Sequence, residues 1–162
     1  MKKTLLPALA VALTLPLAAR ADHLPMPKDA PPSYKTECGS CHLAFPPALL
    51  TASDWRLVMT QLPKHYGDNA TLDQKARQPL EDFLVRNAGS PWRLTGAGDP
   101  PRLTATSWFQ RKHDELSSAV WRDKRVGSAA NCAACHPDAE RGGYGEREVT
   151  VPGHTRRRDH DG

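Results

Sequence analysis

The four cysteines of this 162-residue chain fall into one short motif that occurs twice. The motif is C-x-x-C-H, beginning at Cys38 in the first half and at Cys132 in the second. This spacing is typical of covalent haem attachment, in which two thiols bond to the porphyrin edge and the next histidine binds the iron. The repeat therefore predicts two haem c cofactors. The predicted attachment residues are Cys38, Cys41, Cys132 and Cys135, and the predicted iron ligands are His42 and His136.

Paired cysteines have three other common uses. A structural zinc site could combine two C-x-x-C pairs, but these pairs lie 94 residues apart and each is followed by a histidine. A thioredoxin-like redox pair would lie near a βαβ pattern, and no strand-rich run flanks either motif. Disulfides suit an exported protein but would not require histidine at the fifth position twice. The repeated histidine favours haem.

The sixth ligand of each iron decides what that iron can do. A strong sixth ligand leaves electron transfer, whereas an open position permits substrate binding. His65 lies 23 residues after His42, and His113 lies 23 residues before His136, so each falls in the segment of its own motif. Both are equally compatible with plain surface histidines. The weaker candidates are His23, Met26, His154 and His160.

Met59 is the main rival to His65 at the first iron. Methionine and histidine together are a common ligand pair in cytochromes c. However, Met59 lies four residues after Trp55 on one side of a predicted helix, and this spacing is more typical of core packing.

Short helices with much coil are predicted to position these residues in the first half. Ser33 and Ser53 mark two helix starts, and a capping box from Thr71 to Gln74 marks a third. Pro79 is expected to kink or interrupt this third helix. Residues 87–101 contain three glycines and three prolines, which is typical of a linker.

The second half is predicted to be helical as well, with a less regular end. A helix starts at Thr106 or Ser107 and continues through Leu116, and Ser128 caps the helix that carries the second motif. Residues 146–151 alternate in polarity and predict a short strand or an extended arm. The predicted fold class is mainly α.

The amino terminus has the pattern of a secretory signal. Lys2 and Lys3 precede an apolar stretch, and Ala19-Arg20-Ala21 has small residues at both positions that a signal peptidase reads. The apolar stretch is shorter than the ~20 residues of a membrane-spanning helix. We therefore expect residues 1–21 to be cleaved before Asp22, which would leave a periplasmic protein with no membrane span.

Composition and charge narrow the possible functions. Aromatic residues are only 6% of the chain and prolines number 15, so a non-peptide group such as haem is expected to fill the interior. Of the 22 basic residues, three lie in the predicted leader, and the 19 that remain nearly balance the 18 acidic residues. This balance argues against a nucleic-acid binder. The tail, residues 152–162 with Arg156 to Arg158, is expected to be disordered.

Several stretches resemble the dihaem cytochrome c family whose members partner a small oxygen-binding monohaem cytochrome. In the first half these are Glu37–His42, Phe45–Leu50 and His65–Ala70. In the second half they are Trp108-Phe109 with His113, Trp121–Asp123 and Val126–His136.

The resemblance implies a domain similar to class I cytochromes c over residues 22–95 and a smaller haem domain over residues 96–151. It implies bis-histidine ligation, which pairs His42 with His65 and His136 with His113. It also implies an electron donor to the oxygen-binding cytochrome, supplied by a membrane b-type cytochrome. We expect the protein to be a monomer.

The sequence therefore favours an electron-transfer protein that is not an enzyme. The alternatives are a small dihaem enzyme, such as a peroxidase, or a gas-binding protein with one open iron. Little chain remains to build a substrate pocket once two haems are enclosed.

Overall fold

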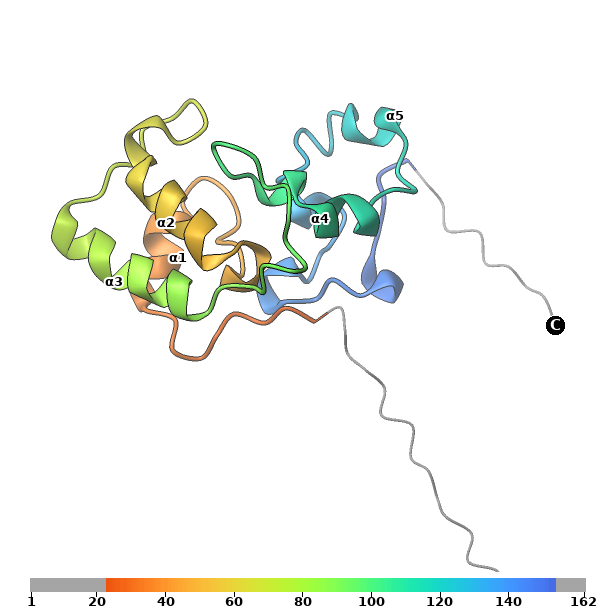
Figure 1. Cartoon of the computed structure of the whole chain (residues 1–162). Coiled ribbons are helices and arrows are strands. Elements are labelled where there is room, and N and C mark those ends of the chain that lie inside the picture. The colour runs from red at the N-terminus through yellow and green to blue at the C-terminus, as the bar shows by residue number, and fades with distance from the viewer. Residues whose placement is uncertain (1–22, 154–162) are drawn as a thin grey trace, which may run out of the picture.

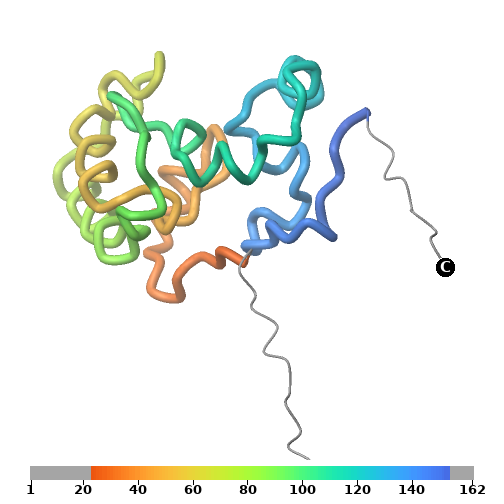
Figure 2. The backbone as a smooth tube through the Cα atoms, turned by 45° about the vertical axis from the view of Figure 1, so that its right-hand side comes forward, coloured from red at the N-terminus to blue at the C-terminus, as the bar shows by residue number. Residues whose placement is uncertain are grey.

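The computed structural model describes residues 23–153, and this part of the chain contains helices and isolated β-bridges but no sheet. It forms two lobes, seen on either side of Figure 1 and again after rotation in Figure 2. The helices are α1 (Pro32–Cys38), α2 (Ala52–Thr60), α3 (Gln74–Arg86), α4 (Ser107–Lys112) and α5 (Ser118–Trp121). Short 3₁₀ helices lie between them, at Pro47–Leu49, Leu62–Lys64, Leu103–Ala105, Cys132–Ala134, Ala139–Arg141 and Glu146–Glu148. The predicted mainly α class is confirmed.

The first lobe is built on the packing of α2 against α3. Thr51 and Asp54 form a capping box that starts α2. The buried side of α3 presents Leu80, Phe83 and Leu84, each at most 1% exposed. These apolar side chains bury most of their surface, which is the main stabilising term for such short helices.

Helix starts in this lobe differ from their predicted positions. Pro31 precedes α1 and makes no side-chain cap, although Ser33 was expected to cap. Asp73 caps α3 through a hydrogen bond from the Ala76 amide, because Thr71 instead donates to the side chain of Asn69. The predicted interruption at Pro79 is wrong. The helix continues because the next turn buries its apolar side chains in the core.

The linker, residues 87–101, packs closely against the first lobe. Its Leu94 and Ala97 are buried. The Gly89 amide donates to the carbonyl of Leu50, and a Cβ at Gly89 would lie 2.2 Å from the carbonyl oxygen of Ala48. Only glycine allows this approach. The hydrophobic core then continues across the predicted boundary at residues 95 and 96 to Leu103 and Phe109 in the second lobe. The two-domain division remains a prediction.

The second lobe has shorter elements than its sequence predicted. Thr106 starts α4 as expected, but the helix ends at Lys112, before Leu116. The second motif lies in a 3₁₀ turn, and the Ser128 hydroxyl accepts from the Ala130 amide and does not cap this turn. Residues 146–148 form another 3₁₀ turn where a strand or arm was predicted.

The start of the described chain crosses to the second lobe (Figure 2). His23 pairs with Gly143 in an isolated β-bridge, and the Leu24 amide donates to the carbonyl of Gly142 at 3.0 Å. Gly142 has a φ of 79°, and a Cβ there would lie 2.6 Å from the backbone of Leu24 and Pro25. This close approach requires glycine.

Several predictions fall outside the described residues, namely the signal peptide, His154, His160 and the Arg156–Arg158 tail. Within residues 23–153, none of the helices has the length and apolar character to cross a membrane.

Candidate functional site

The first motif begins at the end of α1 and continues through a bend. Cys38 is the last residue of the helix, and Gly39 follows as its C-cap. The ring of His42 lies against that of Phe45, with centroids 4.7 Å apart and planes at 20°. Its Nδ1 lies 2.7 Å from the carbonyl oxygen of Leu43. A carbonyl can only accept, so Nδ1 carries the hydrogen and Nε2 keeps the lone pair that binds metal.

His65 is held by contacts that join the two lobes. Its neighbour Tyr66 has a φ of 51°, an uncommon backbone conformation for a bulky residue. The Tyr66 hydroxyl donates to the carbonyl of Pro101, and the Arg102 guanidinium lies 4.3 Å from the centre of the Tyr66 ring. The Asp68 amide closes the loop by donating to the His65 carbonyl at 3.0 Å. The orientation of His65 therefore depends on residues far away in the sequence.

The structure brings His42 and His65 together. Their ring centroids lie 6.2 Å apart and their planes are 21° from parallel. Two metal–imidazole bonds of about 2 Å each place ring centroids about 6 Å apart across an ion, so this pair fits a shared iron. Met59 is 3% exposed in the core of the first lobe.

His113 is oriented by the helix that it ends. It is the C-cap of α4, and its Nδ1 lies 2.8 Å from the carbonyl oxygen of Phe109, one turn earlier. Its ring stacks on that of Phe109 with centroids 4.0 Å apart and lies 5.8 Å from Trp121. The Nδ1–H donates to the carbonyl, so Nε2 is again left for a metal.

The second motif forms a compact turn that directs His136 toward His113. The amides of Cys135 and His136 both donate to the Cys132 carbonyl, at 3.2 and 2.8 Å. The His113 and His136 ring centroids lie 6.2 Å apart, with planes at 83°. The distance equals that of the first pair, while the angle is close to perpendicular.

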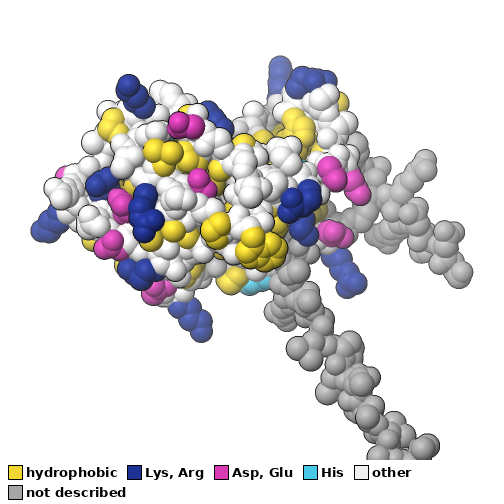
Figure 3. All heavy atoms as spheres, in the orientation of Figure 1, with side chains coloured by type: hydrophobic (Ala, Val, Ile, Leu, Met, Phe, Trp, Pro, Cys, Tyr) yellow, Lys and Arg dark blue, Asp and Glu magenta, His cyan; other side chains and the backbone are white. Residues whose placement is uncertain are grey.

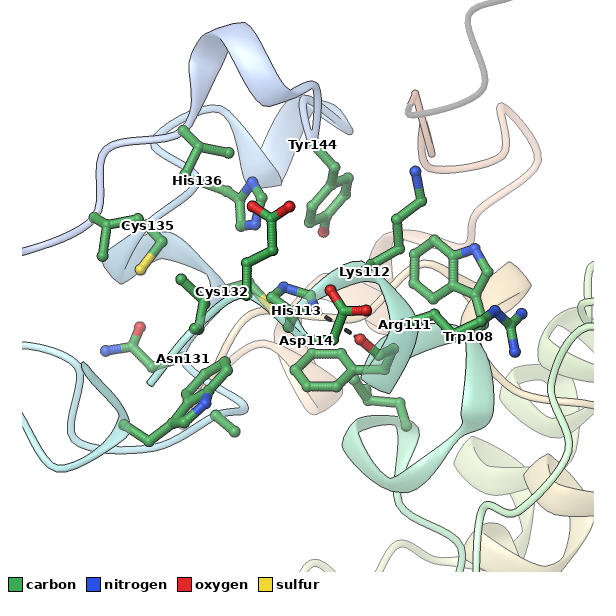
Figure 4. Close-up of a pocket in the computed structure, with 18 of the residues that line it drawn as sticks. Trp108, Arg111, Lys112, His113, Asp114, Asn131, Cys132, Cys135, His136 and Tyr144 are labelled. Carbon is green, nitrogen blue, oxygen red and sulfur yellow. Dashed lines mark hydrogen bonds between the residues drawn. The ribbon is translucent and has the colours of Figure 1, made fainter. Parts of the chain in front are cut away.

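A cavity of about 740 Å³ lies against this second pair. Pockets that enclose drug-sized ligands and cofactors span about 300–1,000 Å³. Leu24 of the N-terminal segment and Leu49 of the first lobe line it. Aromatic residues of the second lobe line it as well, among them Trp108 and Tyr144 (Figure 4). The lining also includes both histidines of the second pair, two cysteines and four aromatic residues: His113, His136, Cys132, Cys135, Trp108, Phe109, Trp121 and Tyr144.

Polar atoms at this cavity also fit a bound group. Within the described chain, the Tyr144 hydroxyl and the His136 Nδ1 are buried and have no hydrogen-bond partner. In Figure 4 the Tyr144 hydroxyl points into the cavity. Buried polar atoms rarely stay unpaired. The apolar walls, two thiols and two imidazoles suit a haem, whose polar edge groups would meet such a hydroxyl.

Ionisation at the two motifs supports the same chemistry. Burial raises the pKa of Cys38 and of Cys132 to about 11 in each case, so before haem attachment both thiols would be protonated at neutral pH. A thioredoxin-like pair instead lowers the pKa of its attacking thiol. Burial, together with the partner imidazole, lowers the pKa of His65 and of His136. This shift favours the neutral ring, the form that binds metals.

Sequence reasoning predicted the two histidine pairs that the structure brings together, but it missed the residues that orient them. Phe109 stands four residues before His113, and that helical spacing was a usable signal. The contact from Tyr66 to Pro101 had no local signal. His23, a weaker ligand candidate, is exposed and pairs with Gly143.

A sequence model of the dihaem cytochrome c family matches residues 34–144 of the chain. Three solved structures are also similar. A dihaem cytochrome c from Shewanella baltica OS155 is 39% identical with a TM-score of 0.68, covering 77% of this chain and 95% of its own. Two dihaem cytochrome c structures from Rhodobacter sphaeroides are 42% and 40% identical with TM-scores of 0.62 and 0.63. They cover 71% and 72% of this chain and 97% and 98% of their own. No curated protein sequence matches.

Proposed function

This chain belongs to the dihaem cytochrome c family, and we propose that it carries electrons in the periplasm between a membrane donor and a soluble haem protein. Its cofactors are two haem c groups. Each bound haem iron supplies a centre that gains and loses one electron. The protein's part is to attach, orient and shield these groups.

The proposed assignment gives each haem two thiols and two imidazoles. Cys38 and Cys41 attach the first haem, and Cys132 and Cys135 attach the second. The proposed iron ligands are His42 with His65 at the first site and His136 with His113 at the second. The observation that carries this assignment is the 6.2 Å separation of the ring centroids in both pairs.

Bis-histidine ligation explains why we propose a carrier and not an enzyme. Imidazole on both faces leaves no position on the iron for a substrate or a gas. Nitrogen ligation on both sides also favours a lower reduction potential than methionine–histidine ligation, because a thioether raises the potential.

The proposed partners follow the family resemblance. We propose a membrane b-type cytochrome as the donor and a small oxygen-binding monohaem cytochrome as the acceptor, with this protein acting as a monomer. Basic and acidic side chains are interspersed on the face shown in Figure 3 and are not gathered by sign. Such a surface supports an encounter with the redox partners that involves little electrostatic steering. Export would follow cleavage of residues 1–21 before Asp22.

Absorption spectra of the reduced holoprotein with and without carbon monoxide test the proposed function. We expect a low-spin α-band that carbon monoxide leaves unchanged. A fraction of high-spin iron in the resting protein, or a carbon monoxide adduct, would favour the enzyme or gas-binding alternative.

Two matched variants test the ligands individually. His65→Ala should allow carbon monoxide to bind about half of the haem, at the first site alone. His113→Ala should have the same effect at the second site alone. An unchanged spectrum in either variant would show that this histidine is not a ligand.

A further inference from the structure

The two histidine pairs share a separation but differ in the angle between their rings. The planes of His42 and His65 are 21° from parallel, whereas those of His113 and His136 stand at 83°. This difference bears on the two irons only if the four histidines are the proposed ligands, so the inference rests on the proposed function.

Contacts of the protein fix the orientation of one ring in each pair. His42 lies against Phe45 at 20° and His113 lies against Phe109 at 22°, and each donates its Nδ1–H to a backbone carbonyl. A ring held by both a face contact and a hydrogen bond cannot turn about its Cβ–Cγ bond without losing one of them.

The second ring of each pair also has an aromatic neighbour. His65 meets Tyr66 edge-on, with centroids 4.8 Å apart at 64°. His136 meets Tyr144 with centroids 5.3 Å apart at 57°. Tyr66 is itself anchored to Pro101, and Tyr144 lines the cavity at the second site. The angle between the two imidazole planes in each pair is therefore set by the residues that surround the pair.

The angle between two axial imidazoles affects the electronic structure of the iron that they share. Each ring donates π density to the d orbital perpendicular to its own plane. Parallel rings act on the same orbital and separate it in energy from its partner, which stabilises the ferric state. Perpendicular rings act on different orbitals, which then remain close in energy. Ligand orientation is thus one of the ways in which a protein sets a haem potential.

We propose that the near-parallel pair His42 and His65 and the near-perpendicular pair His113 and His136 make the two haem sites inequivalent, with the higher reduction potential at the second site. Phe45 and Phe109 act as positioning residues, because each holds one imidazole plane. Each pair contains one Nδ1–H bond to a carbonyl, so this hydrogen bond does not distinguish the sites.

Low-temperature electron paramagnetic resonance of the oxidised holoprotein tests the proposal directly. We expect two low-spin signals. The first site should give a rhombic signal with three resolved g values, and the second a single feature at large g. During stepwise reduction at controlled potential, the large-g signal should disappear first. Two rhombic signals, or earlier loss of the rhombic signal, would overturn the proposal.

A matched pair of variants connects each signal to its site. Phe109→Leu removes the aromatic face next to His113 but keeps the backbone carbonyl, and it should shift the large-g signal alone. Phe45→Leu should shift the rhombic signal alone. The opposite assignment, or no shift in either variant, contradicts the role of these residues.

The same spectra separate failure of this inference from failure of the proposed function. A high-spin signal at either site means that the bis-histidine assignment is wrong, and both proposals then fail. Two low-spin signals of the same shape leave the electron-carrier proposal intact and overturn only the inequivalence.

Discussion

The two haem sites use the same pentapeptide motif in different structural settings. At the first site the motif begins at the end of a seven-residue helix, beside a core built by α2 and α3. At the second it lies in a three-residue 3₁₀ turn, in a lobe whose longest helix has six residues within the described chain. The motif thus specifies attachment chemistry, while the surrounding fold differs.

The sites also differ in how the histidine proposed as the sixth ligand is oriented. His113 is held from within its own helix, by the carbonyl and ring of Phe109. His65 lies on a loop. The hydroxyl of the next residue, Tyr66, donates a hydrogen bond to the carbonyl of Pro101, 35 residues later in the sequence. A locally oriented ligand depends on one helix turn, whereas a ligand oriented at long range depends on the packing of both lobes.

Removing one haem at a time should give the largest effect, because the two lobes should differ in how much structure each keeps without its haem. Replacing both Cys132 and Cys135 by alanine should leave one haem per chain and unfold much of the second lobe, because that lobe has few buried apolar residues of its own. Replacing Cys38 and Cys41 by alanine should leave α2 packed on α3. Haem counting by mass spectrometry and amide hydrogen exchange measure both outcomes. If the two variants lost protection from amide hydrogen exchange equally in their affected lobes, the lobes would not differ in their dependence on haem.

Gly142→Ala tests how far the second lobe depends on the start of the described chain. A Cβ at this position would meet the backbone of Leu24 and Pro25 at 2.6 Å, and its φ of 79° is unfavourable for alanine. We expect the free energy of unfolding to fall by about 2 kcal/mol, with increased exchange at the Leu24 amide.

Gly145→Ala is the matched control for this variant. A Cβ at Gly145 would lie 3.5 Å from its nearest neighbour, an ordinary contact. The control should be nearly neutral in chemical denaturation. If both variants had the same stability, the close approach at Gly142 would not contribute to the second lobe.

Tyr66→Phe should give a smaller loss of stability than Gly142→Ala, and it sharpens the comparison of the two proposed sixth ligands. Removing the hydroxyl deletes its hydrogen bond to Pro101 and should cost about 1 kcal/mol. The Asp68 amide, which donates to His65, should exchange about fivefold to tenfold faster. The contacts of His113 should be unaffected.

Tyr34→Phe provides the control, because its hydroxyl also donates to a backbone carbonyl, that of Phe45 at 2.6 Å. It should cause a similar loss of stability without faster exchange at Asp68. Equal exchange at Asp68 in both variants would mean that Tyr66 has no special role in holding the His65 loop.

Short-range chemistry explains what the sequence predicted well. The C-x-x-C-H spacing indicated two haems because the covalent reaction fixes residue type and distance together. The mainly α class followed from helical patterns and turn residues. The helix start at Thr106 was also found, since a threonine before an apolar run is a local signal.

Local signals failed where a nearby side chain offers a different hydrogen bond or where the local backbone departs from the residue pattern. Thr71 was predicted to cap α3, but its hydroxyl donates to Asn69 and Asp73 takes the cap. The extended arm predicted for residues 146–151 begins instead as a 3₁₀ turn at Glu146–Glu148.

The sequence alone determined that the chain binds two haems and predicted which residues attach them, because two thiols and a histidine at fixed spacing have few other uses. Only the tertiary structure decided that both imidazole pairs lie 6.2 Å apart, at 21° in one pair and 83° in the other. It also decided that Leu24 of the N-terminal segment and Leu49 of the first lobe line the cavity of the second lobe. The orientation of the histidine rings and the lining of the cavity by both lobes depend on contacts between segments that are distant in the sequence. No local pattern of residues encodes such contacts.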